Sequence, residues 1–444
     1  MRRRTFNTAV AAGAAAALTP NTTAAAADGT TATPIQVPVK VGGVNGHIYG
    51  ALNTPPGATT LQVLVHGWTY NRHYFDAPYK PDTYSYARAA NRAGYATLAI
   101  DRLGAGCSLH PLSVFDTLDN HVAAIHKTIQ AARNGDFGTA FDKVILVGHS
   151  LGSIMSATTA GRHPEDIDAL ITTGYAHQVN ALYAFPTIVG RDYLAAGDPQ
   201  FAAQQLDPLY VSSIPGARYT FYRYEYTNPV TGEYELLNAE QEMVDTDEEF
   251  MRATASLTQF ATALPTLLIN ETADLNVPVL AVNGDTEPFF CGAGTATCTS
   301  DESIVAFESQ YYAAGAHIEG YSVPGTGHDI HLELTSPDAS ARMIAFCDAQ
   351  VGAGDGAKNA APAPTLSCPQ PEPIDPPLAA CLANRLLTSL VLPVINLYAD
   401  TVDPLPGMGD GYNPIPVVAE FLTEVNRIIT QVVGGLPISL KQEP

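Results

Sequence analysis

The residue best suited to chemistry is a serine that stands between two glycines. It lies at the centre of Gly148-His149-Ser150-Leu151-Gly152, directly after the apolar run Val144 to Val147 and before an apolar helical pattern. A strand that turns sharply into a helix through glycines exposes the serine hydroxyl at the turn. A serine hydroxyl is a weak nucleophile on its own, so we searched the chain for a base and an oxyanion site.

Strands and helices alternate on both sides of this turn. Residues 35–52 alternate in character around Gly42-Gly43, which predicts an antiparallel hairpin. The later patterns predict strands at 61–65, 96–100, 144–147, 167–172, 277–284 and 318–323, and helices at 83–92, 118–133, 151–161, 301–314 and 336–350. Such alternation favours an α/β fold with a mostly parallel central sheet flanked by helices and with chemistry at the carboxyl ends of the strands.

One segment interrupts the alternation. Residues 175–270 are rich in Tyr, Phe, Pro and acidic residues, with helical periodicity but no clear buried strand. An aromatic insertion between two sheet strands is typical of a cap over an active site, and the alternative is a helical appendage with its own aromatic core. We therefore predict a core of residues 35–174 and 271–350 with a helical cap insertion between its two parts.

The chain after residue 350 changes in composition. Residues 351–378 are rich in Gly, Ala and Pro, which predicts a linker or a segment that follows the surface. An apolar stripe from Val417 to Val433 predicts an amphipathic helix that docks on its own domain. Residues 351–444 are thus expected to form a C-terminal extension.

Charge and the first residues indicate where the protein works. The 444-residue chain has a formal net charge of −22, which disfavours nucleic acid and anionic lipid as partners and favours neutral substrates. Residues 1–27 combine a basic start, a short apolar segment and a small-residue cleavage region, and they contain an Arg-Arg-x-Phe pattern. These features predict a twin-arginine-like signal peptide and a secreted protein. No other segment has the ~18 unbroken apolar residues of a membrane span.

Export makes the six cysteines candidates for disulfides. Cys291 and Cys298 bracket a short loop and form the pair that we expect first. The pairing of the other four is open, although the three nearest the C-terminus are expected to attach the tail to the body. The four are Cys107, Cys347, Cys368 and Cys381.

Five motifs together carry a family resemblance. They are Val65-His66-Gly67-Trp68, Asp101 to Ser108, Gly148 to Gly152, Gly284-Asp285-Thr286-Glu287 and Gly325-Thr326-Gly327-His328-Asp329. In these motifs the chain resembles serine hydrolases of the α/β-hydrolase superfamily, such as secreted bacterial esterases and lipases. The resemblance covers residues 35–349 and follows the superfamily order of nucleophile, acid and histidine. It implies the α/β-hydrolase fold.

The resemblance also implies catalytic roles. Ser150 would be the nucleophile and His328, after the last strand, the general base that takes its proton. His331, three residues further on, is the competing base. The superfamily acid usually stands three residues past the glycine, which is Glu287 here, and Asp285 is the less favoured alternative.

Other residues are expected to support these three. The oxyanion hole would consist of the backbone N–H groups of Trp68 and Leu151. His66 is expected to brace the oxyanion loop, His149 to pack beside the nucleophile turn, and the stretch from Asp101 to Ser108 to support the sheet edge.

Metal and cofactor sites are not expected. The sequence contains no His-x-x-x-His or Cys-x-x-Cys pattern, and Gly104-Ala105-Gly106 lacks the third glycine of a dinucleotide site.

These observations lead to one expected activity and two alternatives. We expect a serine hydrolase that cleaves small neutral carboxylic esters through an acyl-enzyme. A serine nucleophile disfavours epoxide hydrolases and haloalkane dehalogenases, which need a carboxylate. A lactonase, thioesterase or peptidase would use the same residues. A non-catalytic secreted binding protein on this fold is the alternative of another class. The sequence indicates no oligomeric state.

Overall fold

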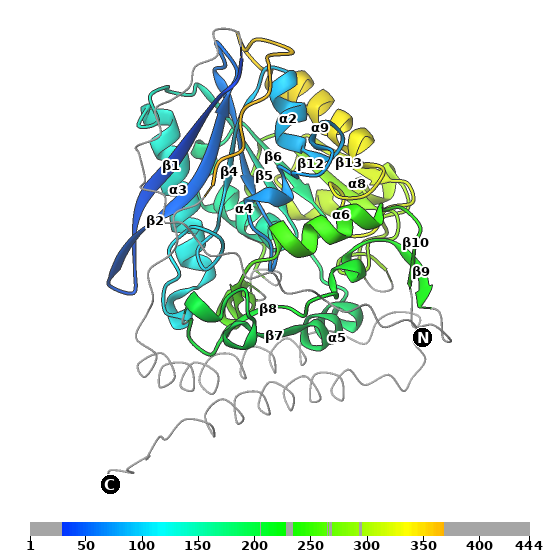
Figure 1. Ribbon diagram of the computed structural model, residues 1–444. Helices are drawn as coiled ribbons and strands as arrows, with labels where there is room; N and C mark the ends of the chain where they lie inside the picture. The colour runs from blue at the N-terminus through cyan, green and yellow to red at the C-terminus, as the bar shows by residue number, and fades with distance from the viewer. Residues whose placement is uncertain are drawn as a thin grey trace.

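The molecule is organised around one twisted sheet of eight strands. A computed structural model describes residues 29–204, 206–227, 234–263, 265, 269–292 and 295–367. The strand order is β1-β2-β4-β3-β5-β6-β12-β13 (Figure 1). The expected signal peptide, the helix expected at 417–433, Cys368 and Cys381 lie outside the described residues.

The sheet begins with an antiparallel hairpin and continues in parallel. In the hairpin, Gly42 and Gly43 have φ values of 58° and 85°, which a two-residue turn of this kind requires. The second hairpin strand pairs antiparallel with β4, and all the later pairings are parallel. The predicted hairpin and the mostly parallel sheet are therefore confirmed. The strands are β1 (Thr31–Val41), β2 (Val44–Thr54), β3 (Thr60–Val65), β4 (Ala96–Ile100), β5 (Lys143–His149), β6 (Ala169–Thr173), β12 (Val279–Gly284) and β13 (Ile318–Val323).

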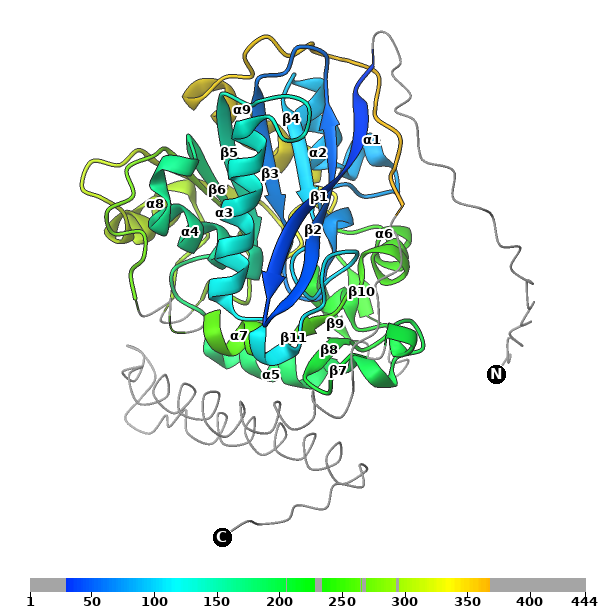
Figure 2. The same ribbon diagram turned by 90° about the vertical axis from the view of Figure 1, so that its left-hand side faces the viewer.

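Helices cover both faces of the sheet, as Figure 2 shows. On one face α1 (Pro81–Tyr84) and α2 (Tyr86–Arg92) pack against α9 (Ser336–Gln350), while α3 (Leu118–Asn134) packs against α4 (Leu151–Arg162) on the other. The remaining core helix, α8 (Asp301–Glu308), packs on β13. Because both faces are covered, strands such as β3 and β12 are buried at every position, which explains the apolar runs at 63–65 and 279–282.

The helix predicted at 83–92 is divided in two. Ser85 has an extended backbone, and its side chain accepts a hydrogen bond from the N–H of Arg88. Ser85 is therefore the N-cap of α2, so α1 and α2 are separate helices.

The insertion at 175–270 is mixed rather than only helical. Its helices are α5 (Ala181–Arg191), α6 (Gln241–Thr246) and α7 (Leu257–Ala263), and its strands are β7 (Asp192–Leu194), β8 (Tyr210–Ser213), β9 (Tyr224–Thr227), β10 (Tyr234–Leu236) and β11 (Ala255–Ser256). Strand β8 pairs with both β7 and β11, and β9 pairs with β10. These strands have two to four residues, too few to show a clear alternation in the sequence. The insertion lies across one end of the central sheet (Figures 1 and 2).

The cysteines follow the expectation in part. Cys291 and Cys298 form the predicted disulfide, and Cys107 is also disulfide-bonded. Cys347 is a buried free thiol in α9 whose sulfur accepts a hydrogen bond from Gln62 Nε2 at 3.6 Å. The prediction that Cys347 attaches the tail to the body is therefore wrong. Its side chain faces the core rather than the segment that follows.

The start of the C-terminal extension follows the surface of the core. The N–H of Ala357 donates to the carbonyl of Pro56 and that of Asn359 to the carbonyl of Arg92, both at 2.8 Å. Further on, the N–H of Thr30 donates to the carbonyl of Ala361 at 2.8 Å. No helix within the described ranges is long and apolar enough to cross a bilayer.

Candidate active site

The turn between β5 and α4 holds Ser150 in a strained conformation. Its φ of 53° and ψ of −122° lie outside the regions that L-residues favour, at a cost of about 1–3 kcal/mol. The flanking glycines permit this turn because a Cβ on Gly152 would lie 2.2 Å from the Val65 carbonyl oxygen, and one on Gly148 would lie 2.5 Å from the Ser153 Cα. The turn therefore has the geometry of a nucleophile elbow.

His328 and Glu287 meet after the last two strands of the sheet. The Nδ1 atom of His328 lies 2.6 Å from Oε2 of Glu287, and the other Glu287 oxygen accepts a hydrogen bond from the N–H of Phe289 at 2.7 Å. Both side chains are buried. Burial alone would lower the pKa of His328, but the adjacent Glu287 carboxylate outweighs it, so the pKa is raised.

Asp285, the alternative acid, points elsewhere. Its Oδ1 accepts a long hydrogen bond, 3.3 Å, from the N–H of Thr326. At the preceding residue, a Cβ on Gly284 would lie 2.1 Å from the Thr326 carbonyl oxygen. This close approach brings the loop after β12 against the loop after β13, and in that arrangement Glu287 reaches the imidazole.

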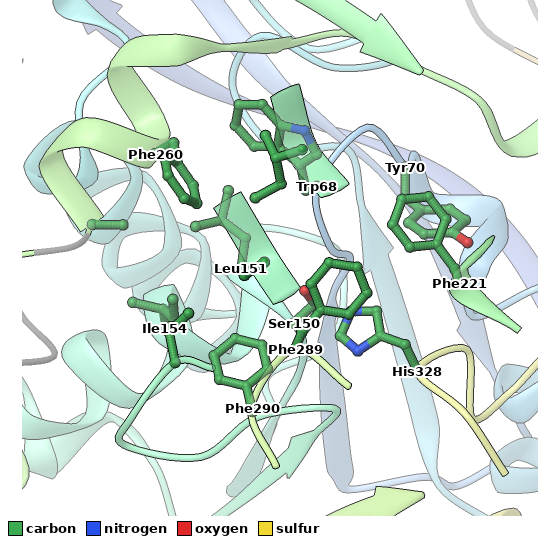
Figure 3. A pocket seen from close by; sticks show the side chains of 14 residues that line it. Trp68, Tyr70, Ser150, Leu151, Ile154, Phe221, Phe260, Phe289, Phe290 and His328 are labelled. Atoms are coloured by element: carbon green, nitrogen blue, oxygen red, sulfur yellow. The ribbon is translucent and has the colours of Figure 1, made fainter. Parts of the chain in front are cut away.

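Ser150 and His328 line the same pocket. Figure 3 shows the serine side chain and the imidazole next to each other, with the ring of Phe289 beside them. The ring centroids of Phe289 and His328 are 4.5 Å apart. This packing fixes the imidazole beside the elbow, so the structure brings together all three residues of the expected triad.

The competing histidine does not reach this pocket. His331 is buried among the rings of Phe75, Tyr74 and Tyr86, at centroid distances between 5.1 and 5.7 Å. Burial, with a smaller contribution from His149, lowers its pKa to about 3 and keeps it neutral. It therefore forms part of the aromatic core under the site.

The loop after β3 passes directly over the elbow. A Cβ on Gly67 would lie 3.0 Å from the His149 ring and 3.1 Å from the Ser150 Cβ. Trp68 and Ser150 line the same pocket, while Leu151 begins α4, where the first N–H groups of a helix have no partner within the helix. Trp68 and Leu151 thus both lie close to Ser150, and the oxyanion role expected for their N–H groups stays a prediction.

A buried arginine holds that loop in place. The Nε2 atom of His66 accepts a hydrogen bond from the N–H of Arg102 at 3.0 Å, and the guanidinium of Arg102 donates to the Gly67 carbonyl at 2.9 Å. Burial and the charge of Arg102 lower the pKa of His66 well below its usual value, so His66 accepts as a neutral ring. The contacts agree with the bracing role expected for His66.

The Asp101 to Ser108 stretch makes contacts within the scaffold. Asp101 forms a buried ion pair with Arg72 at 2.8 Å and accepts from the N–H of Cys107. The Ser108 hydroxyl accepts from the N–H of Tyr49 on β2 at 2.8 Å. These contacts join the loop to the antiparallel edge of the sheet, as expected.

Sequence reasoning missed a contact between the insertion and the oxyanion loop. The indole Nε1 of Trp68 donates to Oδ2 of Asp192, the first residue of β7, at 2.6 Å. Burial raises the pKa of Asp192 to about 7, against the lowering effects of Trp68 and Arg218. A single aspartate in a three-residue strand gives no signal in the sequence.

A buried polar network under the site was missed as well. Tyr70 donates to Asp329 at 2.6 Å, and Arg218 donates twice to one oxygen of Asp247. Burial raises the pKa of both carboxylates, and Arg218 offsets only part of this effect. His149 also lies here, stacked on Tyr74 at 4.1 Å and 3.7 Å from Asp329. The network thus fixes the residues that directly flank Ser150 and His328 in the sequence.

The pocket itself is narrow and mostly apolar. Its volume is about 50 Å³. Core and insertion both contribute to its walls, because Val179, Ile188 and Phe260 come from the insertion. The aromatic lining consists of Trp68, Tyr70, Phe221, Phe260, Phe289 and Phe290 (Figure 3).

Fold and site together define an α/β hydrolase. The chain matches the alpha/beta hydrolase family over residues 62–343, more than half of its length, and it belongs to this family. No curated protein matches the chain significantly.

A search of solved structures finds similar chains at low sequence identity. Est1E from Butyrivibrio proteoclasticus with bound ferulic acid is 18% identical, covering 71% of this chain and 99% of its own, with a TM-score of 0.41. E-2-(acetamidomethylene)succinate hydrolase is 19% identical, with 71% of this chain and 100% of its own covered and a TM-score of 0.45. Epoxide hydrolase A from Mycobacterium thermoresistibile is 16% identical, with 71% of this chain and 98% of its own covered and a TM-score of 0.44.

Proposed function

We propose that this protein is a secreted serine hydrolase that cleaves carboxylic esters through an acyl-enzyme on Ser150. The observation that carries the proposal is the 2.6 Å contact between Glu287 and His328, because His328 lines the same pocket as Ser150. A strained serine, a buried imidazole and a carboxylate that orients it are the parts that nucleophilic catalysis requires.

In the proposed mechanism each group has its own step. Glu287 accepts a hydrogen bond from the Nδ1–H group of His328, which leaves Nε2 as the base for the Ser150 hydroxyl. The serine oxygen attacks the ester carbonyl, and the N–H groups of Trp68 and Leu151 bind the resulting oxyanion. His328 then protonates the leaving alcohol, and a water molecule activated by the same imidazole hydrolyses the acyl-enzyme.

The pocket supports a neutral, apolar acyl or alcohol group. Its lining side chains are aromatic or aliphatic except for Ser150 and His328, so a charged group would lose its hydration there without gaining a partner. The volume of about 50 Å³ favours short chains over long ones. Short-chain esters are therefore the substrates to test first.

Other reactions separate by the type of nucleophile. Epoxide hydrolases need a carboxylate nucleophile, and this chain has Ser150 at the elbow. Lactones, thioesters and amides would use the same groups. A non-catalytic binding protein would have no need of the buried contact between Glu287 and His328.

Covalent labelling tests the proposal. A fluorophosphonate probe should label the wild type, and mass spectrometry of its peptides should place the adduct on Ser150. Ser150→Ala is the control and should remain unlabelled. A panel of p-nitrophenyl esters, lactones and aminoacyl amides then identifies the substrate class. A wild type that neither reacts with the probe nor turns over any member of the panel would contradict the proposal.

Secretion is part of the same proposal and has its own test. The basic and small-residue pattern of residues 1–27 supports it. Protein recovered from the culture medium should begin near Ala27 or Asp28, as mass spectrometry of the intact chain would show. Replacing Arg3 and Arg4 by lysine should retain the precursor in the cell. Normal export of that variant would argue against a twin-arginine signal.

A further inference from the structure

A cluster of two histidines and one aspartate lies far from the pocket. His126 belongs to α3, His163 directly follows the last residue of α4, and Asp166 closes the short turn before β6. Helix α4 begins beside Ser150 and ends at Arg162 after 12 residues, about 18 Å of helix. The cluster therefore lies at the amino ends of the strands, opposite the site described above.

The three side chains offer donor atoms at close range. One ligand atom from each residue lies within 4.8 Å of the other two. Nδ1 of His126 lies 2.6 Å from Oδ2 of Asp166, and the rings of His126 and His163 are stacked with centroids 3.9 Å apart. Donors around a tetrahedral Zn²⁺, with bonds of about 2.0 Å, are about 3.3 Å apart. Insertion of an ion would thus open the His126–Asp166 hydrogen bond by about 0.7 Å and bring the widest donor pair, at most 4.8 Å apart, closer by up to about 1.5 Å. Because the lone pairs of stacked rings are nearly parallel, one imidazole must also turn out of the stack to face the ion.

Access and support also fit a bound ion. Asp166 is fully buried, while the two imidazoles are 33% and 30% exposed, so an ion can enter from solvent. The Gln130 amide donates to Oδ1 of Asp166 at 2.5 Å, which leaves Oδ2 for a ligand and orients the carboxylate as second partners do in metal sites.

The charges around the cluster are balanced. Arg133 binds the backbone carbonyl of Asp166, and its guanidinium is paired with Asp168 at 2.9 Å. On the solvent side, a Glu165 oxygen lies 3.9 Å from Nδ1 of His163. A divalent ion would therefore meet one buried carboxylate and one exposed carboxylate, with the neighbouring cation already neutralised.

We propose that His126, His163 and Asp166 form a structural site for Zn²⁺. Two imidazoles with a carboxylate suit zinc, whereas Ca²⁺ and Mg²⁺ prefer oxygen ligands alone. The ion joins α3 to the connection between α4 and β6. It stabilises the fold and leaves hydrolysis unchanged, because the catalytic groups lie at the other end of the sheet. Sequence spacing does not reveal the site because its ligands are not in a His-x-x-x-His pattern.

The first test is titration of the tag-free, EDTA-treated full chain with ZnCl₂ by calorimetry. We expect one ion per chain. His163→Ala and Asp166→Asn should each weaken binding at least tenfold, with circular dichroism used to verify their folds. The matched control is His317→Ala, since His317 is also exposed and lies 2.7 Å from a carboxylate, that of Glu319, without a third ligand. This control should bind zinc as the wild type does.

Two further readouts do not depend on hydrolysis. Zn²⁺ at a hundredfold excess over the wild-type Kd should raise the Tm of the wild type by about 4 °C and that of His163→Ala by no more than about 2 °C. Co²⁺ should give the intense visible absorption of a tetrahedral site. The proposal is wrong if the wild type shows no saturable binding, or if His163→Ala and Asp166→Asn bind zinc as tightly as the wild type.

Discussion

The contact between Glu287 and His328 gives the sharpest prediction. In Glu287→Gln the side chain keeps its size but loses its charge and one acceptor. Both oxygens of Glu287 accept from N–H groups, one from His328 and one from Phe289. An amide has a single oxygen, so its NH₂ group must face one of these two donors whichever way it is turned. The variant therefore either disrupts the acid loop or forces the imidazole proton onto Nε2, where the serine needs a free lone pair.

The size of the effect follows from these two contacts. A hydrogen bond to a charged group contributes about 1.5–3 kcal/mol, and a buried donor without an acceptor costs about 1–3 kcal/mol. Together they raise the barrier by roughly 3–5 kcal/mol, a loss in kcat of about 10² to 10⁴. Asp285→Asn removes only a long contact to a backbone N–H, 3.3 Å, so we expect less than a tenfold loss.

The assay is the pH dependence of kcat/KM on p-nitrophenyl butyrate. The Glu287 carboxylate raises the pKa of His328, and the histidine must be neutral to accept the serine proton. Wild-type activity should therefore rise with pH through a midpoint above 6.5, the usual histidine value. In Glu287→Gln the midpoint of the residual activity should shift to lower pH than in the wild type. A variant within tenfold of the wild type, or a larger loss in Asp285→Asn, would refute the assignment of the acid.

Three further predictions concern the scaffold. Gly152→Ala places a Cβ 2.2 Å from the Val65 carbonyl oxygen, so urea unfolding should show that the free energy of unfolding falls by more than about 3 kcal/mol. The control is Gly190→Ala, whose Cβ would meet no atom within 4 Å. Burial raises the pKa of Asp192 to about 7, so the folded state binds the proton more tightly than the unfolded chain does. The wild type should therefore lose stability as the pH rises from about 4 to about 7. Asp192→Asn should lose less over this range, as unfolding free energies at pH 5 and pH 8 would show. Replacing Cys291 and Cys298 by serine opens a loop of about eight residues and should lower stability by about 2.5 kcal/mol, and an unchanged Tm would contradict this estimate.

The parts of the site that were predictable carry local signals. Glycine is required on both sides of Ser150 because a Cβ at either position would lie closer to neighbouring backbone atoms than van der Waals distance allows. The sequence motif therefore follows directly from the geometry of the turn. The acid loop has a similar cause, because the close approach at Gly284 brings Glu287 to the histidine loop. The sheet was predictable because its buried strands are long enough to show continuous apolar runs.

The parts that were missed depend on contacts between distant segments. Asp192 meets Trp68 across 124 positions in the sequence, and nothing in either neighbourhood marks the pair. The expectation for Cys347 failed because α9 turns that residue toward Gln62. The short strands of the insertion exist because β8 has partners on both sides, a property of the assembled fold.

The backbone pairing between Gly29 and Ala361 has a consequence for biosynthesis. It closes the described polypeptide into a ring, with its earliest and latest segments as neighbours. A nascent chain leaving the ribosome can assemble the central helices and strands as they emerge. The contact between the start of the first hairpin and Ala361 can form only after residue 361 has left the ribosome. Completion of the structure is thereby delayed until translation has passed that point.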